Sequence, residues 1–158
     1  MSLQLGCVNI YMQIQLVETK VYSLVICDQE EDKPLTGLKV GTAFHPAELE
    51  QFTIVFDLQV ATSDNERVFD IKFVAFFKSD KEITEADREL HFFNVNAPAI
   101  AYPFLRSYVA NVMLLSGYEP VMLSTINFSQ LAKDIAAENE VKEIQDNSGM
   151  IEKPEDRN

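Results

Sequence analysis

Two cysteines and two histidines are the first side chains of this sequence to consider for a cysteine nucleophile or a zinc site. Cys7 and Cys27 stand twenty residues apart, without the Cys-x-x-Cys spacing of a zinc or redox site. His45 and His91 follow no ligand spacing either, and no pattern pairs them with a cysteine nucleophile. The five glycines are not clustered, so no phosphate-binding loop is indicated. We therefore expect no enzyme, no metal site and no cofactor.

The composition excludes further classes of function. The 158-residue chain is 47% hydrophobic and carries eleven phenylalanines, enough for a sizeable core. Its net charge of −12 argues against nucleic acid and anionic membrane surfaces, and it favours basic partners. Because it has two cysteines and no leading signal segment, we expect a cytoplasmic protein. We expect one domain over residues 1–146, followed by an acidic, disordered tail over residues 147–158.

One apolar stretch, from Pro98 to Ser116, organises the rest of the chain and predicts a long helix. Pro98 fits the first helical turn, Gly117 ends the run, and Arg106 is the only charge inside it. One sheet covers one side of such a helix, so we expect a second copy of the chain on the other side. A core helix of a monomer stays an alternative, whereas the polar interruptions and the missing basic flanks disfavour a membrane span. The residues that we assign to an oligomer interface are Tyr102, Leu105, Tyr108, Val109 and Val112.

Alternating apolar and polar residues predict four strands before this helix. The first runs over residues 10–26 and bends near Glu18, where its alternation breaks. The others cover about Leu38–Phe44, Phe52–Val60 and, after a hairpin turn at 63–66, residues 68–77. The inward face of the last strand carries Phe69, Ile71, Phe73, Ala75 and Phe77, and its outer face carries the apolar Val74 and Phe76.

Two shorter helices complete the expected fold. Thr84 and Asp87 resemble a capping box at the start of one helix, and Asn127 or Ser129 caps a final helix. Strands followed by helices predict an α+β fold: a four-stranded antiparallel sheet with the long helix packed on it and a C-terminal helix.

The predicted fold leaves a surplus of apolar side chains. These are Val74, Phe76, Phe92, Phe93, Tyr102, Phe104, Tyr118 and Met122. They could all belong to the core or to a subunit interface, where aromatic side chains bury best. Alternatively, some line a groove that accepts extended, unfolded chains through apolar contact and hydrogen bonds to a strand edge.

Three stretches resemble the SecB family of bacterial export chaperones. The first strand shares Gln13-Ile14-Gln15, Thr19-Lys20 and Ser23 with that family. The start of the long helix, Pro98-x-Ile100-x-Tyr102-Pro103-Phe104-x-Arg106, is similar to the family's PNILFPYAR signature. The stretch after the helix shares Gly117-Tyr118, Pro120, Leu123 and Ile126-Asn127-Phe128. Together with the hairpin between them, the resemblance covers roughly Tyr11 to Ile135.

The resemblance implies an ATP-independent holdase that binds unfolded or non-native polypeptides in protein export. It implies a homotetramer, a dimer of dimers, whose long helices lie between two sheets. The client-binding groove residues that it suggests are Phe76, Phe77, Phe92, Phe93, Tyr118 and Met122. It matches Arg106 to the family's helix arginine, and we expect this lone charge in an apolar helix to have a buried partner.

Several positions depart from the family's pattern. Acidic residues on the outer sheet face dock the SecA motor in the family, but two of these positions are Val21 and Val25 here. Asp70 keeps the acidic type and is our motor-docking candidate. A chaperone of a toxin–antitoxin pair, with an antitoxin as its partner, is therefore an alternative function. A non-chaperone oligomeric scaffold that kept the fold but lost the groove is another.

Overall fold

The computed structural model describes residues 12–30, 35–88, 90 and 92–137. The chain divides into two compact units, Met1–Ser124 and Thr125–Asn158, and each is described here by itself. The predicted division into a domain over 1–146 and a tail stays a prediction, and the tail at 147–158 lies outside the described residues. Within the part of the chain that the structure describes, no helix has the length and apolarity needed to cross a membrane.

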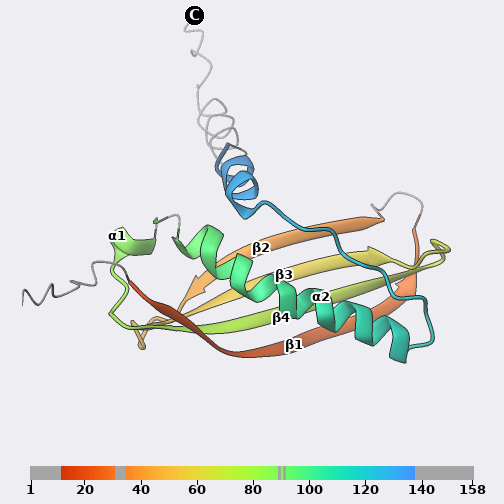
Figure 1. Cartoon of the computed structure of the whole chain (residues 1–158), viewed down its shortest axis with the longest axis horizontal. Helices are drawn as coiled ribbons and strands as arrows, with labels where there is room; N and C mark the ends of the chain where they lie inside the picture. The colour runs from red at the N-terminus through yellow and green to blue at the C-terminus, as the bar shows by residue number, and fades with distance from the viewer. Residues whose placement is uncertain (1–11, 31–34, 89, 91, 138–158) are drawn as a thin grey trace, which may run out of the picture. The chain divides into compact units, whose positions relative to one another are not determined.

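The first unit is built on a four-stranded antiparallel sheet, as predicted (Figure 1). Its strands are β1 (Ile14–Asp28), β2 (Thr36–Phe44), β3 (Gln51–Ala61) and β4 (Arg67–Ser79). Their order across the sheet is β1-β4-β3-β2, which makes β1 and β2 the edge strands. The fold class is therefore α+β, as the sequence predicts.

Strand β1 is interrupted twice along its pairing with β4. The first register shift falls between Leu16 and Glu18, where the sequence predicts a bend. A second shift, between Val21 and Ser23, was not predicted. Each shift adds an unpaired residue and reverses the face on which the following side chains lie. In contrast, β2 pairs with β3 in an unbroken register.

The core lies on one face of the sheet, which we call the inner face. The inner-face residues of β3 and β4 are almost completely buried: Phe52, Ile54, Phe56, Leu58, Val60, Phe69, Ile71, Phe73, Ala75 and Phe77. Two of these rings, those of Phe52 and Phe77, stack with their centroids 5.1 Å apart. The period-two pattern in the sequence thus assigned the inner faces of both central strands correctly.

Two short helical segments connect the sheet to the long helix. The helix α1 (Glu85–Arg88) is a single turn that begins at the predicted capping box. The Thr84 backbone N–H donates to Asp87 Oδ2 at 2.9 Å, and the Asp87 N–H donates to Thr84 Oγ1 at 3.3 Å. The π-helical segment η1 (Phe92–Asn96) then leads directly into α2 (Ala97–Leu115).

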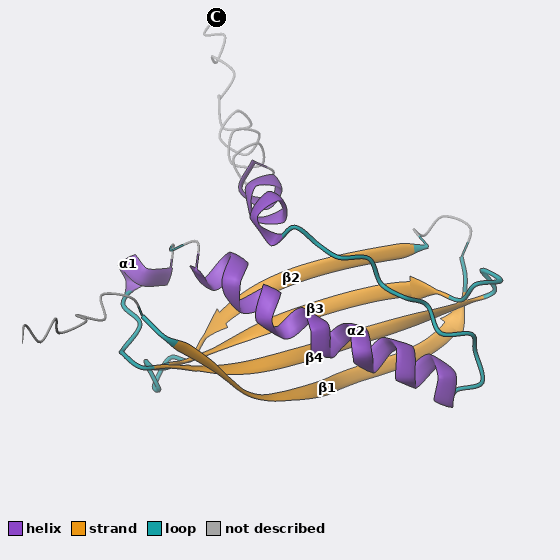
Figure 2. Cartoon of the chain, in the orientation of Figure 1, coloured by secondary structure: helices purple, strands orange, loops and turns teal. Residues whose placement is uncertain are grey.

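Helix α2 lies across the inner face of the sheet, close to its predicted bounds (Figure 2). Its end is a Schellman motif, in which the Tyr118 N–H donates to the Met113 carbonyl at 2.9 Å. Gly117 makes this possible because its φ of +85° is a conformation that side chains with a Cβ disfavour. The prediction that Gly117 ends the helix is therefore confirmed.

The second unit contains a helix over residues 128–137. Asn127 Oδ1 accepts a hydrogen bond from the Gln130 backbone N–H at 3.2 Å, so Asn127 rather than Ser129 is the capping residue.

Candidate functional site

Helix α2 is apolar on two opposite sides, and only one of them is covered within the subunit. The covered side packs on the sheet through Ala97, Pro98, Ala101, Tyr102, Leu105, Val109 and Met113. The uncovered side carries Ile100, Phe104 and Leu114, which are 43%, 51% and 60% exposed. A single subunit therefore leaves a row of apolar side chains in solvent along its longest helix.

This arrangement changes which residues are available to a second subunit. Tyr102, Leu105 and Val109, which we expected at the oligomer interface, are buried against the sheet of their own subunit. Tyr108 and Val112 are half-buried. The sequence pattern located the apolar helix correctly, but the helical period divides it into faces, and the outward face belongs to other residues.

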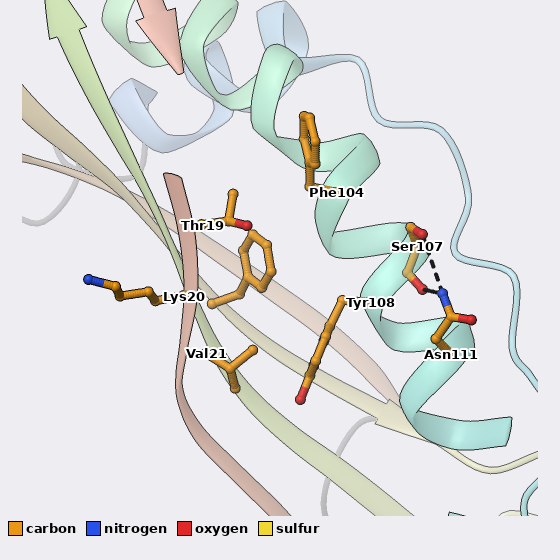
Figure 3. A pocket seen from close by; sticks show the side chains of 8 residues that line it. Thr19, Lys20, Val21, Phe104, Ser107, Tyr108 and Asn111 are labelled. Carbon is orange, nitrogen blue, oxygen red and sulfur yellow. Dashed lines mark hydrogen bonds between the residues drawn. The ribbon is translucent and has the colours of Figure 1, made fainter. Parts of the chain in front are cut away.

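A groove lies between β1 and α2 and is open to solvent (Figure 3). It has a volume of about 330 Å³. Its floor and walls are Thr19, Lys20, Val21, Phe73, Phe104, Ser107, Tyr108 and Asn111. The Lys20 ammonium points away from the groove, and the Tyr108 ring stands between the helix and β1 (Figure 3). We call this the β1 groove.

The polar groups of the β1 groove are uncharged. Burial raises the pKa of Tyr108, so its phenol stays protonated at neutral pH. The Asn111 side-chain amide donates to the Ser107 carbonyl at 2.8 Å, which holds it along the helix. The groove thus offers apolar walls with a few neutral hydrogen-bonding groups, a lining that suits uncharged chain segments.

A second groove lies on the other flank of α2, against the segment 118–124 that follows the helix. It has a volume of about 310 Å³. Its lining consists of Pro103, Arg106, Ser107, Ala110, Asn111, Met122 and Leu123. We call this the Arg106 groove. The outer wall of this groove can adapt to different bound side chains, because Met122 is unbranched, polarizable and 73% exposed.

The segment 118–124 is attached to the rest of its unit at both ends. The ring of Tyr118 meets Phe69 edge to face, with centroids 5.4 Å apart. The hydroxyl of Tyr102 donates to the Ser124 carbonyl at 2.8 Å, and Leu123 beside it is buried. Burial raises the pKa of Tyr102, an effect that the nearby Arg106 opposes. The backbone of this groove wall is therefore held in place, while the Met122 side chain is exposed to solvent.

Comparison of the sequence with known protein families identifies the family of this chain. A model of the SecB family, described as preprotein translocase subunit SecB, matches residues 4–139. The chain belongs to the SecB family. Protein-export protein SecB of Anaplasma phagocytophilum is 34% identical over 74 residues, which are 46% of each chain. SecB of Halorhodospira halophila is 26% identical over 106 residues, 65% of this chain and 60% of that one. The matched regions of these two relatives thus span about half of their length.

Three further comparisons extend over more of the chain. SecB 1 of Polaromonas naphthalenivorans is 28% identical over 134 residues, 80% of this chain and 85% of that one. A SecB-like chaperone of Mycobacterium tuberculosis, solved with a peptide from an antitoxin, has a TM-score of 0.54 at 16% identity. It covers 72% of this chain and 87% of its own. A Streptococcus agalactiae protein of unknown function has a TM-score of 0.52 at 14% identity, covering 73% and 99%. The sequence matches indicate a divergent member of the SecB family, and the two solved structures share its fold.

The six residues that we expected in one client-binding groove do not lie together. Phe77 and Phe93 are 1% and 0% exposed, so they are core residues rather than groove residues. Phe76 lies on the outer face of β4, on the opposite side of the sheet from α2. Met122 lines the Arg106 groove, and its role in client binding stays a prediction. Tyr118 is half-buried against Phe69 near the start of the same segment.

The remaining member, Phe92, is half-buried at the start of η1 and packs edge to face on Phe93, with centroids 5.7 Å apart. Adjacent residues such as Phe92 and Phe93 therefore have different environments. A sequence pattern can place such a pair at an element boundary but does not tell which of the two turns inward.

The outer face of the sheet carries a different set of groups. Tyr22 packs near Phe76, with ring centroids 6.4 Å apart, and Lys20 Nζ lies 5.3 Å from the Phe76 ring centroid. These contacts explain how an outward phenylalanine is half-buried in one subunit. Farther along the same face, Asp70 accepts a hydrogen bond from Gln59 Nε2 at 3.2 Å.

The second bulge in β1 separates the two positions that we matched to the family's acidic docking residues. Val21 pairs with the inward Phe73 and lines the β1 groove, whereas Val25 pairs with Asp70 on the outer face. The expectation that both lie on the outer face is therefore wrong for Val21. A bulge shifts the alternation by one residue, and neither its presence nor its position follows from the local sequence here.

Sequence reasoning missed the groove roles of Val21 and Arg106. Arg106 was expected to have a buried partner, but none of the described residues accepts a hydrogen bond from its Nε, which is shielded from solvent. A signal was present for Arg106, since it is the one charged residue of an otherwise uncharged helix. Among the described residues, no cluster of three or more His, Cys, Asp or Glu could hold a metal ion.

Proposed function

We propose that this SecB is an ATP-independent holdase, which binds non-native polypeptides and keeps them from aggregating. The observation that carries the proposal is the pair of open grooves on the two flanks of α2, each walled by exposed apolar side chains such as Phe104 and Met122. Their linings combine apolar side chains with polar ones such as Ser107 and Asn111, so they can accept many sequences. No chemical step and no cofactor form part of this function.

The proposed mechanism is the burial of client apolar surface at many weak sites. Each square ångström of apolar area removed from water contributes about 25 cal/mol, so short contacts are individually weak. Two grooves in each subunit, repeated over an assembly, raise the overall affinity because the second contact is intramolecular. The net charge of −12 keeps the loaded complex soluble and favours clients with basic stretches.

We further propose that the assembly is a homotetramer, a dimer of dimers. What supports this is the outward face of α2, whose Ile100, Phe104 and Leu114 have no cover in the subunit. A second copy of the chain would remove these side chains from water and would also close part of the grooves. Sedimentation velocity at low micromolar concentration should give a tetramer, and a stable monomer would contradict the proposal.

The clients that we propose are exported proteins in the cytoplasm, with SecA as their receiver. An antitoxin is the second candidate, because the M. tuberculosis structural neighbour is solved with an antitoxin peptide. Asp70 remains our motor-docking candidate on the outer face, although its carboxylate already accepts from Gln59 and Val25 stands opposite it. A SecA pull-down with wild type distinguishes the two kinds of client, because absence of SecA binding favours the antitoxin. Weaker SecA binding by Asp70→Asn would support Asp70 as the docking residue.

Suppression of aggregation tests the holdase directly. Wild type at one tetramer per chain of a denatured model substrate should suppress light scattering without ATP. Met122→Asp places a carboxylate in the Arg106 groove at a position that is already exposed, so it should weaken suppression without unfolding the protein. The matched control is Leu49→Asp, an exposed apolar residue in the turn between β2 and β3. Absence of suppression by wild type would refute the proposal.

A further inference from the structure

One wall of the Arg106 groove is a segment without regular structure. Residues 118–124 follow the end of α2 and belong to no helix or strand. Among the described residues, no backbone–backbone hydrogen bond involves residues 119–124. Met122 and Leu123 nevertheless line the groove together with helix residues such as Pro103. Because an irregular segment without such bonds opens at little cost in free energy, other contacts must hold this wall in position.

The hydroxyl of Tyr102 fastens the far end of this wall. It donates to the Ser124 carbonyl at 2.8 Å, between residues that lie 22 positions apart in the chain. It is the one hydrogen bond that the described residues make to residues 119–124. Burial raises the pKa of Tyr102, so the hydroxyl keeps the proton that it donates at neutral pH. The polar part of the attachment therefore depends on a single side chain.

The ring of Tyr102 is itself held firmly. It is 6% exposed, on the side of α2 that the sheet covers, and its centroid lies 6.3 Å from that of Phe56. Tyrosine has two χ angles, so a ring packed in this way leaves its hydroxyl little freedom to move. Tyr102 does not line the groove, so its effect on a client would pass through the wall. The PNILFPYAR signature carries phenylalanine at this position, so the hydroxyl is a departure from that signature.

We propose that Tyr102 is a positioning residue for client binding, because its bond to Ser124 forms the Arg106 groove before a client arrives. The inference rests on the proposed holdase function and names a residue on which the affinity of one groove depends. A wall already in place costs the client no ordering entropy, whereas a loose wall must be ordered as the client binds. The hydroxyl raises the population of the binding-competent groove and so raises the apparent affinity.

The rest of the subunit depends little on this bond. Ser124 is an exposed residue, so its carbonyl can bond to water when the hydroxyl is missing. Phenylalanine at position 102 would keep the apolar packing of the ring. The segment would still be attached through the edge-to-face contact of Tyr118 with Phe69 and through the buried Leu123. Loss of the hydroxyl should therefore loosen the wall and leave the subunit folded.

Tyr102→Phe tests the proposal by fluorescence anisotropy with a labelled apolar peptide that is acetylated, amidated and uncharged. Its dissociation constant should rise about two- to fivefold, the factor by which one hydrogen bond of typical strength shifts a two-state equilibrium. Tyr22→Phe is the matched control, because it removes an exposed hydroxyl on the outer face of the sheet and should leave the dissociation constant unchanged. Circular dichroism at the temperature of the measurement verifies that each variant is folded.

A double-mutant cycle with Met122→Ala distinguishes positioning from a general loss of stability. Met122 belongs to the wall that the bond holds, so its truncation should weaken binding by a factor about twofold or more larger in wild type than in Tyr102→Phe. In Tyr22→Phe the same truncation should have its wild-type effect. A variant that is only less stable lowers the amount of competent protein equally with and without the Met122 side chain, so it shows no such coupling.

Each contrary result bears on one step of the inference. An unchanged dissociation constant in Tyr102→Phe overturns the role of Tyr102 and leaves the holdase intact. Weaker binding without coupling to Met122 overturns it too, because the hydroxyl then acts elsewhere than at this wall. If Tyr22→Phe weakens binding equally, the loss does not depend on the bond to Ser124 and the inference fails. If wild type binds no peptide and suppresses no aggregation, the proposed function itself fails.

Discussion

Neighbouring phenylalanines on β4 should differ sharply in what they contribute to stability. Phe77 is 1% exposed, and its ring stacks on Phe52 with centroids 5.1 Å apart. Replacing it with alanine removes a fully buried ring and leaves a cavity that the sheet cannot close, which costs about 3–5 kcal/mol. A loss of this size is a large fraction of the roughly 5–15 kcal/mol that stabilises a typical domain.

Phe76 faces the other way and is only half-buried, covered by Tyr22 and Lys20. Its replacement with alanine leaves no closed cavity, since the outer face is open to water, so we expect a loss of about 1 kcal/mol. In a protein of this size each kcal/mol lowers the melting temperature by about 2–4 °C. The Phe77→Ala melting temperature should therefore fall by about 6–20 °C and that of Phe76→Ala by a few degrees.

The assay is urea and thermal unfolding followed by circular dichroism, with both variants and wild type at one protein concentration. A fixed concentration matters because association stabilises the folded subunit by mass action. Phe76→Ala and Phe77→Ala are the same substitution at adjacent positions, so they change the composition and the unfolded state equally. A difference in stability between them therefore reports on the folded state. An equal loss in both variants, or a larger loss in Phe76→Ala, would refute the assignment of the two faces of β4.

Three further predictions follow from the structure. Gly117→Ala should destabilise the protein by about 1–2 kcal/mol through the left-handed φ of +85° alone, because an added Cβ meets nothing within 4 Å; thermal unfolding measures this. Tyr102→Phe should cost about 1 kcal/mol in urea unfolding by removing the bond to Ser124, and unchanged peptide binding would show that this bond does not shape the groove. Hydrogen bonds from the Thr62 hydroxyl and a backbone N–H lower the pKa of Asp64, which favours its ionised form in the folded state. This stabilisation is present above the usual aspartate pKa and is lost as the pH falls through the lowered one, so Asp64→Asn should be less stable than wild type at pH 7 and equally stable once the pH is well below about 4.

Much of the fold was predictable from local patterns. The alternation in residues 52–60 and 69–77 predicted both central strands and their buried faces, because side chains in a strand alternate with a period of two. Pro98 and Gly117 predicted the two ends of α2, since the backbone geometry of a helix terminus favours these residue types. The candidate site was predicted less well: Phe77 and Phe93 are core residues, and the client-binding role of Met122, which lines a groove, stays a prediction.

The amino-acid sequence by itself determined the kind of protein: an acidic chain with a sheet and a long apolar helix. It could do so because composition and periodicity depend only on neighbours along the chain. Tertiary structure alone decided which side of each apolar element is left in solvent. The bulges in β1 turn Val21 toward a groove, and the packing of α2 on the sheet turns Phe104 outward and leaves the Nε of Arg106 without an acceptor among the described residues. Such outcomes depend on register and packing between segments far apart in the sequence, where one residue of shift moves a side chain to the opposite face.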